Sequence, residues 1–326
     1  MATTPARYGM TVPFDGTPLP AGFDTTRWTV MSYTDYEDSG FRFFQLDGNS
    51  LVADTLTVQP STPMLLDIIA IQGVYGASDN VELGANTYTI DEDRPFMATL
   101  VDHGGIDTFD LRDHSRPSKI NLAPGEFSSI DFYSIEAQIA FWQAAFPDFT
   151  PSFIANYINR PTTYTWSNNL ATSLDTVIEN VLAGSGSDTI IGNSAANSIS
   201  GGAGSDSIAA SGGNDTVDGG SAGAAGNYLR GDDGNDSLIG GANFDDINGN
   251  MGSDTVSTGA GDDFCVGGRD NDLLFGGSGV DFTYGNLGDD SCNGDDGNDI
   301  IRGGQGNDTL AGGAGDDFIS GDRGDD

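Results

Sequence analysis

An aspartate recurs every nine residues from Ala183 to the end of the 326-residue chain. Each unit reads Gly-Gly-x-Gly-x-Asp-x-apolar-x, with the aspartate at the sixth position and usually an aliphatic residue at the eighth. Carboxylates in glycine-rich turns, with main-chain carbonyls around them, are hard oxygen ligands suited to a divalent cation. The sixth-position aspartates are Asp188, Asp206, Asp215, Asp236, Asp245, Asp254, Asp263, Asp272, Asp281, Asp290, Asp299, Asp308, Asp317 and Asp326.

This period predicts a solenoid in which each unit contributes one turn and one short strand. Glycine is needed where the chain adopts positive φ and where neighbouring backbones approach closely. The eighth-position side chain points inward, so two stacks of short parallel strands enclose a thin core. Cys265 and Cys292 hold that inward position three units apart, which places them on opposite sheets. We expect buried core thiols there, with a disulfide as the minor alternative.

The same stacking predicts calcium between the turns. Carboxylates about 5 Å apart repel by about 1 kcal/mol even in water, and ordering a glycine-rich chain costs about 1–2 kcal/mol per residue. One small apolar side chain per unit cannot offset both terms, whereas a dication removes the repulsion. Calcium fits better than magnesium because it accepts six to eight oxygens in flexible geometry. Without calcium, a disordered tract rich in glycine and aspartate is the expected state.

The predicted calcium ligands combine sixth-position carboxylates with glycines of the turns. Asn replaces the aspartate at 197 and 227, and a three-residue insertion lies near Gly223, so we expect weakened or missing ions there. Besides the aspartates named above up to Asp317, the expected ligand set contains Gly201, Gly202, Gly204, Gly267, Gly268, Gly285, Gly294, Gly303, Gly304, Gly306, Gly312, Gly313 and Gly315.

Composition and charge argue against several classes of binding partner and against a membrane span. The formal net charge is −37 and Lys119 is the single lysine, which argues against nucleic acid or an anionic membrane as a partner. No run of eighteen apolar residues is present, so the sequence predicts no membrane span. The N-terminus has no basic start followed by an apolar segment, so no cleavable signal peptide is predicted.

The part before the repeat shows weaker patterns. Thr62 and Pro63 predict the start of a helix that ends near Gly73 to Gly76. Short strands are expected between 88 and 132, and His103 to Asp107 looks like a degenerate turn of the later repeat. A short helix is predicted from Ser134 to Phe146, and the proline-containing stretch 147–173 is predicted to be a loop.

The nonapeptide resembles the RTX ("repeats in toxin") calcium-binding repeat, and three earlier segments resemble serralysins, secreted zinc metallopeptidases of the metzincin clan. Thr29-Val30-Met31-Ser32-Tyr33 is similar to their Met-turn, and residues 62–77 are similar to the helix that closes their protease domain. Residues 107–111, 120–122 and 177–181 resemble the strands that join protease to roll. The resemblance implies that Met31 packs beneath a zinc site and that Tyr33 is a zinc ligand that can support the transition state.

The metzincin zinc helix, His-Glu-x-x-His, does not occur in this sequence. The two histidines, His103 and His114, follow the Met-turn with a spacing that fits no zinc signature, so no complete zinc site is expected. We interpret the sequence as a piece of a larger protein, cut at both ends and inactive as given. The expected fold is mainly β. Residues 1–80 form the end of a metzincin-like α+β protease domain, 81–182 a strand-rich junction with an insertion at about 131–173, and 183–326 the RTX β-roll.

The leading hypothesis is the calcium-binding C-terminal portion of a secreted serralysin-type zinc metalloendopeptidase, whose roll folds on calcium after export. It implies several calcium ions, zinc only in the longer parent, and peptide substrates if that parent is active. It also implies the type I secretion machinery of a Gram-negative bacterium, a route without a signal peptide. The alternative is a non-catalytic RTX adhesin or extracellular binding protein with a protease remnant.

Overall fold

The computed structural model describes residues 40–47, 50–57, 64, 68, 82–92, 96–160, 163, 165–222 and 226–326. They belong to two compact units, and the chain passes from one unit to the other several times. The first unit includes residues up to Leu83, Asp91–His103 and Pro124–Thr176. The second unit, here called the roll, includes Gly84–Ile90, Gly104–Ala123 and Val177–Asp326. The Met-turn residues Met31 and Tyr33, and nearly all of the helix expected from Thr62, lie outside the described residues.

The first unit combines a hairpin, two helices and a small sheet. Strands β1 (Gly40–Asp47) and β2 (Ser50–Thr57) pair antiparallel. Helices α2 (Ile135–Ala145) and α3 (Pro151–Ile158) follow each other, and Phe44 of the hairpin packs in one cluster with Ile154 and Ile158 of α3. The three-stranded sheet consists of β4 (Ala98–Leu100), β8 (Leu170–Thr172) and β7 (Phe127–Ser128).

The helix predicted from Ser134 to Phe146 is confirmed, and the loop predicted for 147–173 is wrong. Ser134 is the N-cap of α2, and its hydroxyl accepts a hydrogen bond from the Ala137 N–H at 3.1 Å. Within 147–173 the structure has α3 and β8. Pro151 stands in the first turn of α3, where the missing N–H has no intrahelical partner to lose, so this proline starts a helix.

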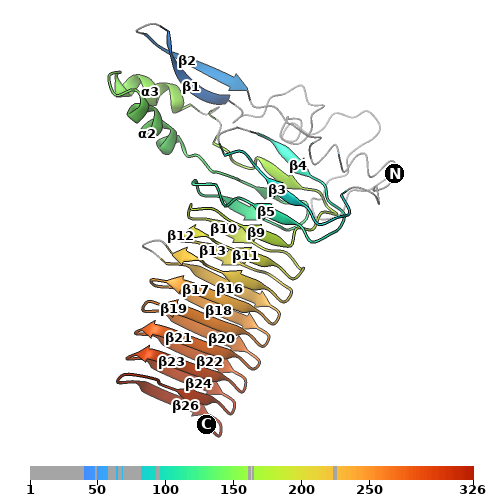
Figure 1. Ribbon diagram of the computed structural model, residues 1–326, viewed down its shortest axis with the longest axis vertical. Coiled ribbons are helices and arrows are strands. Elements are labelled where there is room, and N and C mark those ends of the chain that lie inside the picture. Colours follow the sequence, from blue (N-terminus) through green and yellow to red (C-terminus); the bar gives the residue numbers. More distant parts are fainter. Residues whose placement is uncertain are drawn as a thin grey trace. The chain divides into compact units, whose positions relative to one another are not determined.

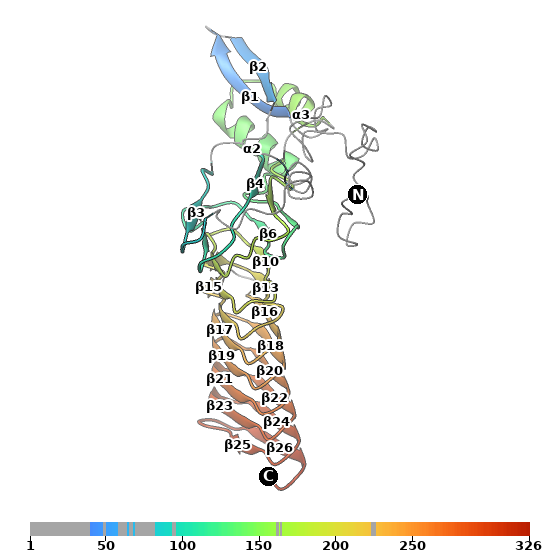
Figure 2. The same ribbon diagram turned by 90° about the vertical axis from the view of Figure 1, so that its right-hand side faces the viewer.

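The roll contains two parallel sheets that face each other, as expected for a mainly β solenoid (Figure 1, Figure 2). The nine-stranded sheet consists of β6 (Lys119–Asn121), β10 (Thr189–Ile191), β13 (Ser207–Ala209), β16 (Tyr228–Asp233), β18 (Asp246–Met251), β20 (Phe264–Arg269), β22 (Phe282–Leu287), β24 (Ile300–Gln305) and β26 (Phe318–Arg323). The ten-stranded sheet consists of β3 (Thr87–Thr89), β5 (Thr108–Asp110), β9 (Asn180–Leu182), β11 (Ser198–Ser200), β14 (Thr216–Asp218), β17 (Ser237–Ala242), β19 (Thr255–Ala260), β21 (Leu273–Gly279), β23 (Ser291–Gly297) and β25 (Thr309–Ala311). A minor parallel pair joins β12 (Ala203–Gly204) to β15 (Ser221–Ala222).

Each rung of the roll contains two nine-residue units, one strand in each sheet, so residues 18 apart in sequence become neighbours. Ile190 of β10 lies beside Ile208 of β13, and Leu238 of β17 beside Val256 of β19. The eighth-position side chains from Ile190 to Ile301 are almost all at most 2% exposed and form the core. Cys265 of β20 and Cys292 of β23 are buried free thiols on opposite sheets, as predicted.

The rungs do not stop at the repeat. β9 pairs with β5, which pairs with β3, while β10 pairs with β6. The three-residue insertion is absorbed without loss of register, because Ser207 of β13 pairs with Tyr228 of β16, 21 residues later. Residues 223–225 themselves lie outside the described part. No helix in the described residues is long and apolar enough to cross a bilayer.

Candidate calcium-binding turns

The sixth-position residue of every unit stands in the turn just before a strand, and these residues form two columns along the roll. The backbone N–H of each one donates to Oδ1 of the sixth residue one rung further on. Asp188 N–H donates to Asp206 at 2.7 Å, and Asp236 N–H donates to Asp254 at 2.8 Å. The pattern continues to Asp308, whose N–H donates to Asp326 at 3.0 Å. One carboxylate oxygen per turn is therefore a fixed part of the backbone hydrogen-bond pattern.

The second carboxylate oxygen, Oδ2, is buried and has no hydrogen-bond donor. A buried acceptor without a partner loses the full free energy of its hydration, and native structures rarely tolerate this. Here the buried acceptor without a donor recurs at eleven sixth positions, so it is a regular feature of these turns. The residues concerned are Asp206, Asp215, Asp236, Asp245, Asp254, Asp263, Asp272, Asp281, Asp290, Asp299 and Asp308.

In most units the space in front of Oδ2 is bounded by glycine and by carbonyl oxygens, whereas Asp215 and Asp263 have Ala210 and Thr258 at the first position. A methyl group built on Gly276 would lie 2.8 Å from Asp281 Oδ2 and 2.8 Å from the Gly294 carbonyl oxygen. One built on Gly201 would lie 2.6 Å from Asp206 Oδ2 and 2.9 Å from the Gly219 carbonyl oxygen. The first-position glycines thus leave room for an ion between a carboxylate and a carbonyl of the next rung.

The predicted glycine ligands occupy two kinds of place. Gly201, Gly267, Gly285, Gly294, Gly303 and Gly312 are first-position glycines that face the Oδ2 of their own unit. Gly202, Gly204, Gly268, Gly304, Gly306, Gly313 and Gly315 have positive φ and lie against the backbone of the preceding rung. Oxygen donors of these two types, carboxylate and carbonyl, are the ligands that calcium prefers, so the residues present fit the ion. No group of three or more His, Cys, Asp or Glu side chains that could hold a metal occurs in the described ranges.

The comparison with protein families agrees with this geometry. Residues 182–217, 221–256, 230–265, 257–292 and 293–326 match the model of the RTX calcium-binding nonapeptide repeat.

The roll carries RTX calcium-binding repeats.

Relatives extend the similarity beyond the repeat. A serralysin from Photorhabdus luminescens is 30% identical over 185 residues, which cover 53% of this chain and 29% of the relative. The metalloprotease AprA of Pseudomonas entomophila is 29% identical over 185 residues, covering 53% of this chain and 30% of the relative. Serralysin C of Dickeya chrysanthemi is 29% identical over 119 residues, 33% of this chain and 22% of the relative. The chain is therefore homologous to serralysins over about half of its length, and it spans about three-tenths of the relatives in the longer matches.

In the two RTX units with asparagine at the sixth position, the side-chain amide forms hydrogen bonds of its own. Asn227 Nδ2 stands where other units have Oδ2 and points at the Gly240 carbonyl oxygen, 3.4 Å away. Asn197 Nδ2 donates to the Glu179 carbonyl oxygen at 3.1 Å. At Asn227 an amide N–H thus contacts the carbonyl that faces Oδ2 in other units, whereas at Asn197 the amide oxygen faces Gly192 and the N–H donates to the preceding rung. This geometry supports the expectation that these turns hold weaker ions or none.

The sixth-position columns continue before the repeat, through Asp107, whose turn the sequence pattern indicated, and through residues that the pattern missed. Asp107 N–H donates to Glu179 Oε2 at 2.8 Å, and Asn86 N–H donates to Asp107 Oδ1 at 2.7 Å. In the other column, Ser118 N–H donates to Asp188 Oδ1 at 2.6 Å. Counting back nine residues from Asp188 would have found Glu179, but the glycines that mark the unit are absent there. The turn at His103 to Asp107, noted as a degenerate repeat, belongs to this extension.

Burial changes the acidity of the carboxyl groups. Loss of hydration is the largest cause and raises the pKa, while the hydrogen bond accepted by Oδ1 lowers it in part. Neighbouring aspartates raise it further, as Asp236 does for Asp254. The pKa rises to about 7 for Asp206, Asp254 and Asp272, and to about 6 for Asp215, Asp245, Asp263 and Asp281. Without a cation, these turns take up protons near neutral pH.

A first prediction exchanges the two kinds of sixth residue. Asp254→Asn should lower the number of bound calcium ions and weaken calcium affinity, because an amide N–H replaces Oδ2. The reverse change, Asn227→Asp, should restore a buried Oδ2 and leave the calcium count equal or higher. Calcium per chain is measured by elemental analysis after gel filtration, and affinity by calorimetry. An unchanged calcium count in Asp254→Asn would contradict the assignment of Oδ2 as a ligand.

A second prediction concerns pH. Because the folded pKa values are raised above 3.8, the metal-free folded roll binds more protons than the unfolded chain between about pH 4 and 7. Its stability is therefore greatest below this window and falls as pH rises through it. In chelator, we expect more β signal by circular dichroism at pH 5 than at pH 8. Calcium must displace those protons, so its affinity should rise by about tenfold per pH unit for each proton displaced, up to about pH 7. A calcium affinity that is constant from pH 5 to 8 would contradict this linkage.

Proposed function

We propose that this chain is the calcium-binding C-terminal portion of a secreted serralysin-type zinc metalloendopeptidase, and that its roll folds when calcium binds after export. The observation that carries the proposal is the column of buried Oδ2 atoms without donors, which makes the folded roll depend on a cation. Homology to serralysins over about half the chain supports the protease part.

Calcium-dependent folding follows from the composition of the roll. Its core has about one small aliphatic side chain per nine residues, and its turns bury one carboxylate each. Binding free energy at the turns therefore becomes folding free energy. Calcium in the micromolar range or below, as inside a cell, would leave the chain unfolded for a type I secretion channel. Millimolar calcium outside would fold it.

The catalytic part of the proposal concerns residues outside the described ranges. Tyr33 would help to hold zinc and would stabilise the oxyanion that forms on a peptide carbonyl, while Met31 would pack beneath the site. Zinc supplies an activated water and polarises the scissile carbonyl when it is bound. The zinc helix would come from a segment outside these 326 residues. The glycine-rich roll contributes no residue to this chemistry and serves folding and export.

Calcium titration tests the folding part. Adding calcium to the chelated chain should produce a cooperative rise in β signal by circular dichroism and a smaller radius of gyration by X-ray scattering. Magnesium at the same concentration is the matched control and should give little of either, because it prefers a tight octahedron and its own waters. A chain that is equally compact and ordered in excess chelator would contradict calcium-dependent folding.

The catalytic part is tested separately, with the protein encoded by the longest reading frame that contains this sequence. That protein should bind zinc and hydrolyse casein. Tyr33→Phe should lower kcat by about a hundredfold or more while the protein still folds with calcium, as expected for loss of one oxyanion donor. A longer protein that binds calcium but neither zinc nor casein would reject the protease and favour the extracellular binding protein.

A further inference from the structure

The two outer faces of the RTX roll differ in their basic residues, although one repeat generates both. All four arginines of residues 183–326 lie on strands of the nine-stranded sheet: Arg230 on β16, Arg269 on β20, Arg302 on β24 and Arg323 on β26. The strands of the ten-stranded sheet contain no Lys or Arg. In a chain of net charge −37, this segregation marks one face as chemically distinct.

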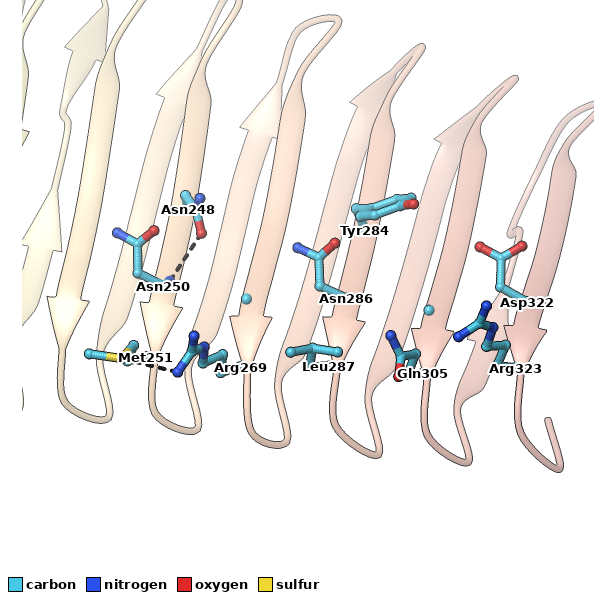
Figure 3. Close-up of a pocket in the computed structure, with 12 residues that line it drawn as sticks. Asn248, Asn250, Met251, Arg269, Tyr284, Asn286, Leu287, Gln305, Asp322 and Arg323 are labelled. Atoms are coloured by element: carbon cyan, nitrogen blue, oxygen red, sulfur yellow. Dashed lines mark hydrogen bonds between the residues drawn. The ribbon is translucent and has the colours of Figure 1, made fainter.

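An open groove of about 810 Å³ lies on that face, across the ends of strands β18 to β26 (Figure 3). Arg269, Leu287, Gln305 and Arg323 follow one another along the strand ends, one per rung. Tyr284 and Asn286 lie further back on β22. At about 4.8 Å per rung, the two arginines are about 14 Å apart along the axis. The groove is therefore a linear site with a cationic group toward each end and an aromatic ring between them, and it also contains one carboxylate, Asp322 of β26.

In the described part of the chain, the guanidinium groups of the groove are not paired with acidic side chains. Within the described part of the chain, Arg269 and Arg323 form no ion pair, and the one side-chain contact recorded for Arg269 is with Met251 Sδ at 4.0 Å. Arg230, outside the groove, is different. It pairs with Asp246 at 2.8 Å, and its guanidinium lies 3.4 Å from the centre of the Tyr228 ring. Guanidinium groups that form no ion pair among the described residues, even with Asp322 in the same groove, are free to contact an anionic ligand.

The groove suits a saccharide better than a peptide. The backbones of β18 to β24 are paired on both sides, so a peptide cannot add to them as a further strand; among the strands of the groove, β26 alone pairs on one side, with β24. Recognition must come from side chains. Amides such as Asn286 and Gln305 offer a donor and an acceptor on one plane, which matches neighbouring sugar hydroxyls. The Tyr284 ring offers a flat apolar surface, and Arg302 Nη1 contacts its hydroxyl at 3.4 Å.

We propose that this groove binds a linear acidic polysaccharide, with Arg269 and Arg323 on carboxylates of the chain and Tyr284 against the face of a sugar ring. The rung spacing is close to the length of one sugar unit, so groups repeated along the roll can meet groups repeated along the polymer. Binding requires the calcium-loaded roll, because calcium offsets the carboxylates of the turns and so reduces the repulsion that an anionic ligand meets. The proposal is independent of protease activity.

The experiment is calorimetric titration of the calcium-loaded chain with a homogeneous oligogalacturonate at fixed free calcium. Arg269→Ser with Arg323→Ser should weaken binding by about tenfold or more, since both carboxylate contacts are lost. Tyr284→Ala should weaken it several-fold. Arg230→Gln is the matched control and should leave the affinity unchanged, because that arginine is already paired with Asp246. Circular dichroism in calcium checks that each variant is folded.

Three outcomes would overturn the proposal. The first is no binding of oligogalacturonate at millimolar concentration by the folded chain. The second is equal binding by the double arginine variant, which would mean that calcium on exposed aspartates bridges the ligand. The third is equal or tighter binding of oligoglutamate, which would make the groove a site for acidic peptides. A neutral oligosaccharide of the same length should bind at least tenfold more weakly than oligogalacturonate.

Discussion

The structure of the roll depends on a carboxylate that is only half satisfied by protein. One oxygen of each sixth-position aspartate accepts a backbone N–H from the neighbouring rung, and in eleven of them the other oxygen is buried without a donor, in most units against glycine and carbonyl oxygens. A larger residue than glycine at the first position would fill the space in front of that oxygen. The glycine content, the acidity and the thin core are therefore consequences of one requirement, which is room and negative charge for a cation between rungs.

The same hydrogen bond explains how far the roll extends. It includes the uncharged asparagines at 197 and 227, and it also occurs before the repeat, at Glu179 and Asp107. A rung can thus form wherever the sixth-position side chain offers an acceptor to the backbone N–H of the sixth residue in the preceding rung. This tolerance lets the chain leave the roll after β6, form α2, α3 and β8 in the first unit, and return at β9 in register.

The repeat constrains the inside of the roll and leaves its outer positions open. On the nine-stranded sheet the outward positions carry arginine, tyrosine and phenylalanine, with Phe264 and Phe282 stacked at 5.0 Å, while the ten-stranded sheet has no basic residue on its strands. Selection for calcium and for folding acts on both faces equally. The acidic ligand proposed for the groove would account for the difference between the two faces.

The nine-residue period by itself determined the parallel roll, the inward eighth position, the opposite placement of Cys265 and Cys292, and calcium as the ion that suits the turns. These follow from spacing because each unit repeats the same local geometry. The helix at 135–145 was also predictable, since Ser134 caps it locally. Only the tertiary structure decided that Oδ1 and Oδ2 have different roles, that Ser118 and Glu179 belong to the columns, and that Pro151 begins a helix. It also brought the four arginines, distant in sequence, onto one face. These features depend on which residues become neighbours across rungs, and sequence distance along the chain does not contain that information where the repeat is irregular.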